Sequence, residues 1–230
     1  MDSIKDKYKN IDPKEFNLHI NNYLDKNEKF DYSSYVENQT ELNILKLQHP
    51  GPPLRRLAKI SEYIKKHIVS LTFGICHGTR RGDEQKIFKE YLGIPVIGTE
   101  ISHTAEQFPD TIQWDFHEVK EEWLNNTSFI FSNSLDHSYD PIHCLSQWMK
   151  CISPTGKIFL QRGVGYVPIR GRLQGFDGGN NCDMFQCSDA AFEKIVALAG
   201  NDEWVVSYPK ELAPSVMGPE KIYVVLERKR

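Results

Sequence analysis

The stretch of sequence that decides the fold is VSLTFGICHGTRRGDEQKIFKEYLGIPVIGTE, residues 69–100. An apolar run rich in β-branched and aromatic residues, 69–76, predicts a buried strand. A polar turn at 77–82 leads into a helix with one apolar face at 83–92, and a second strand follows at 96–99. Strand, turn, helix and strand in this order are typical of the nucleotide-binding half of a doubly wound α/β fold.

The turn within this stretch is the candidate ligand site, because open α/β sheets bind ligands at the carboxyl ends of parallel strands. Gly78 and Gly82 allow the backbone to approach a ligand without an intervening Cβ. Glu100 ends the second strand, about 20 residues after the turn, and its two oxygens suit the paired hydroxyls of a ribose. A plain sharp turn and a solvated strand end are the alternatives for these residues.

The composition favours a soluble protein without strong attraction to polyanions. The chain has 230 residues, enough for one α/β domain with an appended segment, and its formal net charge of -3 argues against a nucleic-acid partner or an anionic membrane. No apolar run approaches the ~20 residues of a membrane span, and the beginning lacks the apolar centre of a secretory signal. The 5 cysteines form no CxxC pair, which disfavours a zinc site and favours a reducing, cytoplasmic compartment.

The first 53 residues differ in character from the rest of the chain. Residues 1–53 are polar with scattered aromatics, and we expect an N-terminal extension that contains a short helix at 13–24. A cluster of helix-breaking residues at 49–53 marks the predicted boundary with the main domain at 54–230. The extension is expected to be a lid over the ligand site or a partly ordered tail.

Helices and strands alternate through the rest of the sequence. They complete a sheet of about seven strands, in which the last two suit an antiparallel pair at one edge. Further strands are predicted at 111–115, 128–133, 157–161, 204–208 and 221–227, and helices at 54–67, 102–108, 118–124, from 141 onward, and from 188 to about 199.

Four motifs resemble those of the class I S-adenosylmethionine-dependent methyltransferases. CHGTRRG, residues 76–82, resembles their glycine turn, and VIGTEIS, residues 96–102, resembles the strand with the ribose-binding acid. WDFHEV, residues 114–119, resembles the third-strand acid that reads adenine. FIFSNSLDHSYDPIHCLSQWMKCISPTGKIFL, residues 129–160, resembles the fourth strand, its acidic loop, a helix and the turn into the fifth strand. The resemblance covers about residues 69–225 and implies a Rossmann-like sheet, mostly parallel with an antiparallel last strand.

The resemblance implies S-adenosylmethionine as the cofactor. Asp115 would accept a hydrogen bond from the adenine amino group while Phe116 packs on the ring, although Asp115 could instead cap a short helix. The implied cofactor-binding residues are His77, Gly78, Thr79, Arg80, Gly82, Glu100, Ile101, Asp115, Phe116 and Ser134.

Two residues depart from the family pattern. Cys76 stands where the family carries an acid, and Arg80 stands at its middle glycine. A cation near a helix N-terminus opposes the dipole, so Arg80 or Arg81 needs an anionic partner, which is either a ligand carboxylate or the nearby Asp83 or Glu84. Arg80 also argues against NAD(P), whose pyrophosphate needs glycine backbone at close range. An NAD(P)-dependent oxidoreductase and a non-catalytic cofactor-binding domain are the alternative functions.

Methyl transfer to a hydroxyl requires alignment of the acceptor and removal of its proton. His137 follows the fourth strand and is the predicted base, with Asp136 or Asp140 orienting its ring. A structural or cofactor-contacting role is the alternative for His137. The predicted function is therefore an O-methyltransferase.

The acceptor is predicted from one long polar segment, residues 162–187, which is rich in Gly, Asn, Asp and Arg. Its aromatic and short hydrogen-bonding side chains suit a sugar, a glycan or a similar small polar acceptor. Several aspartates could bind Mg²⁺, but no compact spacing demands it, so a metal is not favoured and no metal ligand is assigned.

Overall fold

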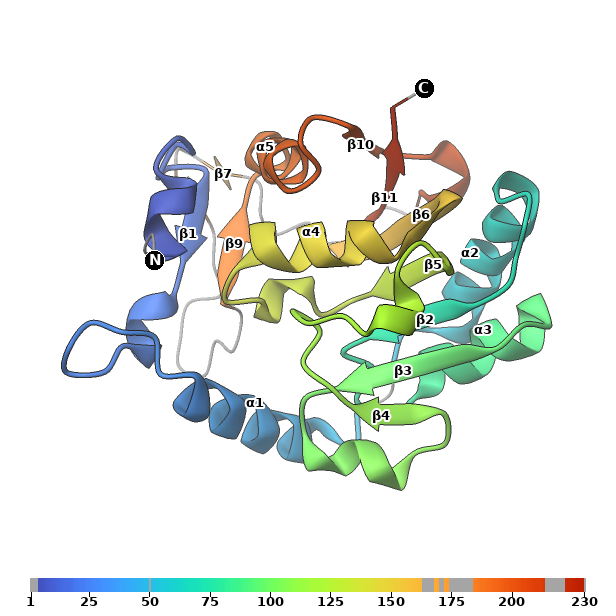
Figure 1. Ribbon diagram of the computed structural model, residues 1–230, viewed down its shortest axis with the longest axis horizontal. Coiled ribbons are helices and arrows are strands. Elements are labelled where there is room, and N and C mark those ends of the chain that lie inside the picture. Colours follow the sequence, from blue (N-terminus) through green and yellow to red (C-terminus); the bar gives the residue numbers. More distant parts are fainter. Residues whose placement is uncertain are drawn as a thin grey trace.

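A seven-stranded sheet forms the centre of the computed structural model, which describes residues 4–49, 51–162, 168–169, 172–173, 184–213 and 222–229. The strand order is β10-β11-β6-β5-β2-β3-β4 (Figure 1). Strands β4, β3, β2, β5 and β6 are parallel, β11 is antiparallel to β6, and β10 is antiparallel to β11. The predicted mostly parallel sheet with an antiparallel last strand is confirmed. The strands span Gly74–His77 (β2), Val96–Glu100 (β3), Thr111–Gln113 (β4), Thr127–Ser132 (β5), Ile152–Arg162 (β6), Trp204–Ser207 (β10) and Ile222–Arg228 (β11).

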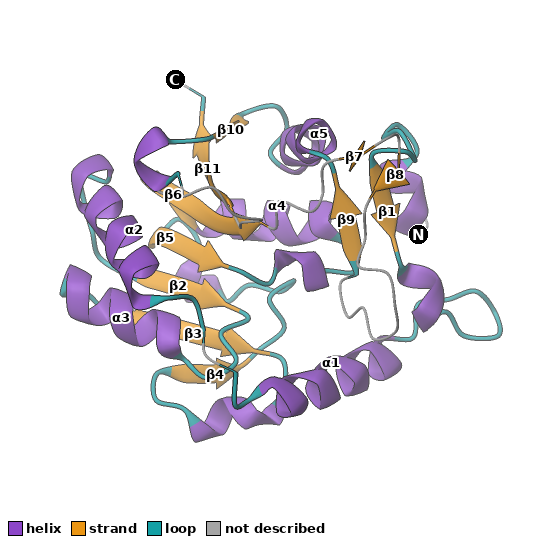
Figure 2. Ribbon diagram, turned by 180° about the vertical axis from the view of Figure 1, so that it is seen from behind, coloured by secondary structure: helices purple, strands orange, loops and turns teal. Residues whose placement is uncertain are grey.

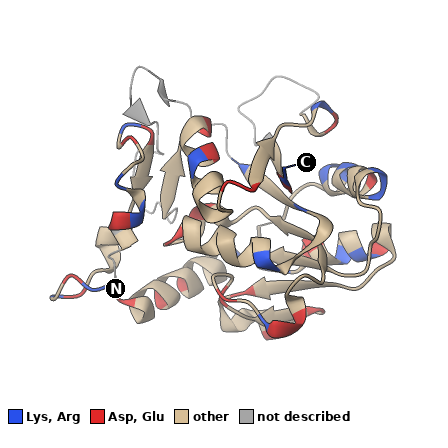
Figure 3. Ribbon diagram, turned by 45° about the horizontal axis from the view of Figure 1, so that its top comes forward, with Lys and Arg blue, Asp and Glu red and all other residues tan. Residues whose placement is uncertain are grey.

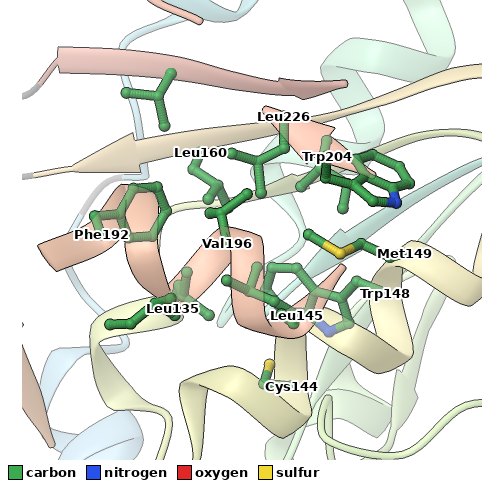
Figure 4. Close-up of a cluster of buried hydrophobic side chains, with 14 of the residues drawn as sticks. Leu135, Cys144, Leu145, Trp148, Met149, Leu160, Phe192, Val196, Trp204 and Leu226 are labelled. Atoms are coloured by element: carbon green, nitrogen blue, oxygen red, sulfur yellow. The ribbon is translucent and has the colours of Figure 1, made fainter. Parts of the chain in front are cut away.

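Helices cover both faces of this sheet (Figures 1 and 2). Helices α4 (Pro141–Cys151) and α5 (Asp189–Ala199) cover one face, and α2 (Leu54–His67) and α3 (Asp83–Leu92) cover the other. Successive strand residues alternate between the two apolar cores because side chains of a strand point to opposite faces. In β6, Leu160 packs with α4 and α5 (Figure 4), whereas Phe159 packs with α2 and α3.

The loops after β2, β3 and β5 meet at one edge of the sheet. The chain moves from β2 outward to β3 and β4, then returns to place β5 on the other side of β2. This reversal of strand order is where open α/β sheets bind ligands. The glycine turn at 78–82 follows β2, so it lies at this position.

The prediction of a helix at 13–24 is wrong. Strand β1 (Phe16–Leu18) pairs antiparallel with β9 (Phe185–Cys187), and a short 3-10 helix, Ile20–Tyr23, follows it. The partner strand lies near the other end of the chain, so no local pattern could indicate this pairing.

The helix of the N-terminal extension instead lies later in the sequence, as α1 (Tyr32–Lys46). Sequence analysis missed it because it has no continuous apolar stripe, and its buried residues include the polar Gln39 and Asn43. Figure 2 shows α1 crossing the molecule on the side toward which β2 and β3 point. It therefore lies over the ligand edge of the sheet.

Several element boundaries also differ from the predictions. The strand predicted at 69–76 is shorter in the structure, where β2 begins at Gly74. Before it, the backbone N–H of Thr72 donates to the Ser128 hydroxyl at 2.8 Å instead of joining the sheet. The helices predicted at 102–108 and 118–124 are 3-10 turns. These two turns span His103–Gln107 and Glu121–Trp123. Other short 3-10 helices lie at Ile4–Tyr8, Leu135–His137 and Lys210–Leu212, and two short strands, Pro168–Ile169 (β7) and Arg172–Leu173 (β8), form an antiparallel pair.

Candidate functional site

The turn after β2 has left-handed backbone at three positions. Gly78 has φ +70°, Arg80 φ +49° and Gly82 φ +77°. A Cβ on Gly78 would lie 2.6 Å from the Cβ of Ser134, so only glycine fits between β2 and the loop after β5. Arg80 adopts this conformation at a cost of ~1 kcal/mol. The turn thus keeps the path of a glycine-rich loop although its middle residue is arginine.

Glu100 is held rigidly beside this turn. Its side chain is only 6% exposed, and it accepts hydrogen bonds from the backbone N–H groups of Arg80 (3.0 Å) and Ser102 (3.1 Å). Burial raises the pKa of Glu100, and these two backbone donors partly oppose the rise. Each carboxylate oxygen has a further lone pair, so Glu100 can still accept bonds from two hydroxyls.

Asp115 belongs to a buried hydrogen-bonded chain. Its Oδ1 pairs with His117 Nδ1 at 2.7 Å, and His117 Nε2 pairs with Ser138 Oγ at 2.7 Å. Its Oδ2 accepts a bond from the Tyr32 hydroxyl of α1 at 2.8 Å. Burial acts to raise the pKa of Asp115, but the bonds from His117 and Tyr32 hold it below its ordinary value. The order Asp–His–Ser matches a hydrolytic triad, yet Ser138 and His117 are fully buried, so the chain fixes Asp115 rather than presenting a nucleophile.

His137 is positioned by α1. Its Nδ1 lies 2.9 Å from Gln39 Oε1, and its backbone carbonyl accepts from the Tyr35 hydroxyl at 3.0 Å. Because an amide oxygen only accepts hydrogen bonds, this contact puts the proton of a neutral ring on Nδ1 and makes Nε2 the basic nitrogen. Asp140, one of the two predicted orienting residues, instead caps α4 and binds Lys7 and Tyr8. That prediction is wrong for Asp140.

A first cavity joins most of the predicted residues. It lies between α1 and the carboxyl ends of the strands and has a volume of about 70 Å³. Its lining consists of Tyr35, Gln39, Leu42, Asn43, Lys46, Gly78, Arg80, Glu100, Ile101, Asp115, Phe116, Ser134 and His137. Sequence analysis missed the five residues from α1, because nothing in the sequence indicated that this helix lies over the site.

Four predicted residues lie outside the first cavity. His77 is 1% exposed and stacks on Trp148 at 4.6 Å, and burial lowers its pKa to about 3, so it is a neutral core residue. Gly82 caps α3, and Asp136 lines a small separate cavity with Arg162. Thr79 lines a second cavity.

The second cavity adjoins the first across the glycine turn, since Gly78 and Arg80 line both. Its volume is about 270 Å³, and it is mainly polar. Its lining consists of His49, Gly51, Pro52, Pro53, Arg56, Gly78, Thr79, Arg80, Arg81, Asp83, Glu84, Asn133 and Gln161.

The two arginines of the turn have partners within the protein. Arg81 pairs with Asp83 at 3.3 Å. The Arg80 guanidinium donates to the backbone carbonyls of Lys46 (3.1 Å) and His49 (3.4 Å), at the C-terminal end of α1, where a cation suits the helix dipole. Of the partners considered from the sequence, the structure shows Asp83 for Arg81. Arg80 instead binds backbone carbonyls at a helix terminus, a partner that the sequence analysis did not consider.

No family model and no curated protein matches the sequence, but solved structures match most of the chain. A TehB-like S-adenosylmethionine-dependent methyltransferase from Corynebacterium glutamicum has 13% identity and a TM-score of 0.52, covering 86% of this chain and 100% of that one. The CcbJ methyltransferase from Streptomyces caelestis has 12% identity and a TM-score of 0.56, covering 84% and 98%. A Burkholderia thailandensis 1,6-didemethyltoxoflavin-N1-methyltransferase, with 1,6-didemethyltoxoflavin and S-adenosylhomocysteine bound, has 11% identity and a TM-score of 0.55, covering 86% and 87%.

The chain has the fold of the class I S-adenosylmethionine-dependent methyltransferases. The resemblance of the four motifs is thus confirmed at the level of the fold. The seven strands of the methyltransferase fold place Glu100 and Asp115 after neighbouring strands, β3 and β4, on one side of the glycine turn. His137 lies on the other side, after β5.

Charged residues of both signs lie on the surface of this methyltransferase fold in the part that the structure describes. Figure 3 shows Lys and Arg interspersed with Asp and Glu, apart from a concentration of basic residues on α2. No described helix is both long and apolar enough to cross a membrane. Among the described residues, no group of three or more His, Cys, Asp or Glu is arranged to hold a metal ion.

Proposed function

We propose that this chain is an S-adenosylmethionine-dependent O-methyltransferase acting on a sugar, a glycan or a similar small polar acceptor. The observation that carries the proposal is the first cavity, in which Glu100, Asp115 and His137 line one space at the strand-order reversal. A hydrolase is not supported, because Ser138 is buried.

The residues of the first cavity fit an adenosine. Gly78 leaves space that a Cβ would fill, and Glu100 keeps lone pairs for two ribose hydroxyls. Asp115 would accept from the adenine amino group in place of the Tyr32 hydroxyl, while Phe116 and Ile101 provide apolar surface for the ring. We assign the cofactor site to these residues together with Arg80 and Ser134 of the same cavity. The buried His77 is left out of it.

His137 is the proposed general base. When bound, S-adenosylmethionine supplies a methyl group on a sulfonium, whose sulfide leaves without needing a proton. The protein must therefore align the acceptor hydroxyl and accept its proton, and Nε2 of His137 is the candidate acceptor atom. Gln39 orients the ring through Nδ1. This assignment replaces Asp140 with Gln39 and keeps Asp136 as a neighbour of the base.

Helix α1 is the proposed lid over this site. It reaches the site loops through hydrogen bonds that Tyr32 and Tyr35 donate and that Gln39 and Asn43 accept, rather than through a broad apolar face. Such contacts exchange with water or ligand more readily than apolar packing does. The extension that ends near residue 53 would thus open to admit the cofactor.

The acceptor class is inferred from the sequence of residues 162–187, most of which lie outside the described residues. Among structural neighbours, a mitomycin 7-O-methyltransferase and the toxoflavin-type N1-methyltransferase bear the names of small molecules. The proposal of a hydroxylated acceptor rests on the aromatic and short polar side chains of this segment.

The test is methyl transfer from cofactor labelled on its methyl group to a panel of small glycosides. Wild-type protein should label one of them. Replacing His137 with Ala should lower turnover by ~10²-fold or more and leave S-adenosylhomocysteine affinity unchanged. His143→Ala, on the half-exposed side of α4, is the matched control and should keep full turnover.

Two outcomes would contradict this function. Binding of S-adenosylhomocysteine without label transfer to any acceptor would favour a non-catalytic cofactor-binding domain. Equal turnover by the wild type and the His137 variant would remove His137 from the mechanism.

A further inference from the structure

Glu84 is a buried carboxylate that faces the second cavity. It lies in the first turn of α3 and is 3% exposed. Its Oε1 accepts a long hydrogen bond, 3.4 Å, from the amide of Asn133. Its Oε2 is buried and has no hydrogen-bond partner among the described residues. A buried acceptor without a partner is destabilising, so a natural protein normally has a use for it.

Two cations that line the second cavity with Glu84 bind other groups. Arg80 donates to backbone carbonyls at the end of α1, and Arg81 pairs with Asp83. Cys76, the nearest ionisable group on β2, is fully buried, and burial raises its thiol pKa, so it carries no charge. Glu84 therefore offers to the second cavity a carboxyl group that a cationic ligand group would ionise.

The two cavities adjoin each other at the glycine turn. Gly78 and Arg80 line both, so a ligand whose adenosine occupies the first can extend across Gly78 into the second. S-adenosylmethionine has the matching shape, because its amino-acid end continues from the ribose through the sulfur. That end is a zwitterion with one ammonium group.

We propose, on the basis of the function proposed above, that Glu84 binds the α-ammonium group of the methionine end of the cofactor in the second cavity. An ammonium supplies donors that Oε2 can accept, together with a positive charge. Burial raises the pKa of Glu84 to about 8, and a bound cation would favour its ionised form. Asn133 holds Oε1, which leaves Oε2 directed to the ligand.

The test compares three ligands by calorimetric titration. S-adenosylhomocysteine carries the ammonium, its analogue with hydrogen in place of the α-amino group lacks only that group, and methylthioadenosine lacks the whole amino-acid end. Wild-type protein should bind S-adenosylhomocysteine ~10- to 100-fold more tightly than the desamino analogue, the range expected of a charge-assisted hydrogen bond.

The variant Glu84→Gln keeps the side-chain shape and removes the charge. It should lower the affinity for S-adenosylhomocysteine by the same ~10- to 100-fold and leave the affinities for the desamino analogue and methylthioadenosine unchanged. Glu90→Gln, on the exposed side of the same helix, is the matched control and should bind all three like the wild type.

The outcomes separate this inference from the proposed function. Equal wild-type affinity for S-adenosylhomocysteine and the desamino analogue would overturn the role of Glu84 and leave the cofactor assignment standing. The same holds if Glu84→Gln weakens all three ligands equally, which would indicate a structural role. Failure of the wild type to bind any of the three would overturn the proposed function and this inference with it.

Discussion

Glu100 and Glu84 are both buried carboxylates, but their surroundings give them different properties. Glu100 accepts two backbone N–H bonds, which stabilise its ionised form. Glu84 accepts a long bond from Asn133, and burial raises its pKa to about 8. Among its charged neighbours, Asp83 and Glu100 raise this pKa and Arg80 lowers it. The protonation of Glu84 therefore depends on which charged groups surround it, including those of a bound ligand.

This property predicts a pH-dependent contribution to stability in the ligand-free protein. The folded pKa of Glu84, about 8, lies above its ordinary value of 4.5, so the folded state binds the proton more tightly than the unfolded state. The contribution is therefore present below the lower value and is lost as pH rises toward the higher one. Wild-type stability should fall by up to ~1 kcal/mol per pH unit relative to Glu84→Gln across this window. Urea unfolding at several pH values measures the difference, and parallel pH curves for the two proteins would contradict it.

Single residues show where sequence reasoning reached its limit. Glu100 and Gly78 could be predicted because a strand end and a tight turn are local features. The partner of His137 could not, since Gln39 is distant in sequence and belongs to a helix without an apolar stripe. His77 lies within the glycine motif, where a residue could contact a ligand. Only its packing on Trp148 in the structure identifies it as a core residue.

At the level of elements, α1 connects the N-terminal extension to the site. Tyr32 contacts Asp115, and Lys46 and Leu42 line the first cavity. The helix was hidden in the sequence because it covers a polar site rather than an apolar core. Helices α2 to α5 were visible because each presents apolar residues at helical spacing to the sheet.

If α1 is a lid, ligand should slow its opening. We expect hydrogen exchange of the α1 amides to slow by up to ~100-fold when S-adenosylhomocysteine is present at 100 times its dissociation constant. Helix α5, on the α4 side of the sheet, is the internal control and should change little. Mass spectrometry of the exchanged protein gives both values. Equal protection of α1 with and without ligand would refute the lid.

At the level of the whole molecule, the extension is integrated with the rest of the described chain. Tyr8, Ile11 and Phe16 are buried in the same core as α4 and α5, and β1 pairs with β9. The boundary predicted at 49–53 is crossed by the Arg80 contacts to α1. The sheet itself could be predicted from alternating strands and helices, whereas the β1–β9 pairing depends on residues far apart in sequence.

The central claim is that the cavity beside Glu100 binds an S-adenosyl ligand, and thermal unfolding with ligands tests it most directly. S-adenosylhomocysteine at 100 times its dissociation constant should add ~2.7 kcal/mol to the stability of the wild type, whereas NAD⁺ should add nothing. In Glu100→Gln, which melts cooperatively if it is folded, most of the shift from S-adenosylhomocysteine should be lost. No shift with S-adenosylhomocysteine, an equal shift with NAD⁺, or a full shift in the variant would contradict the account.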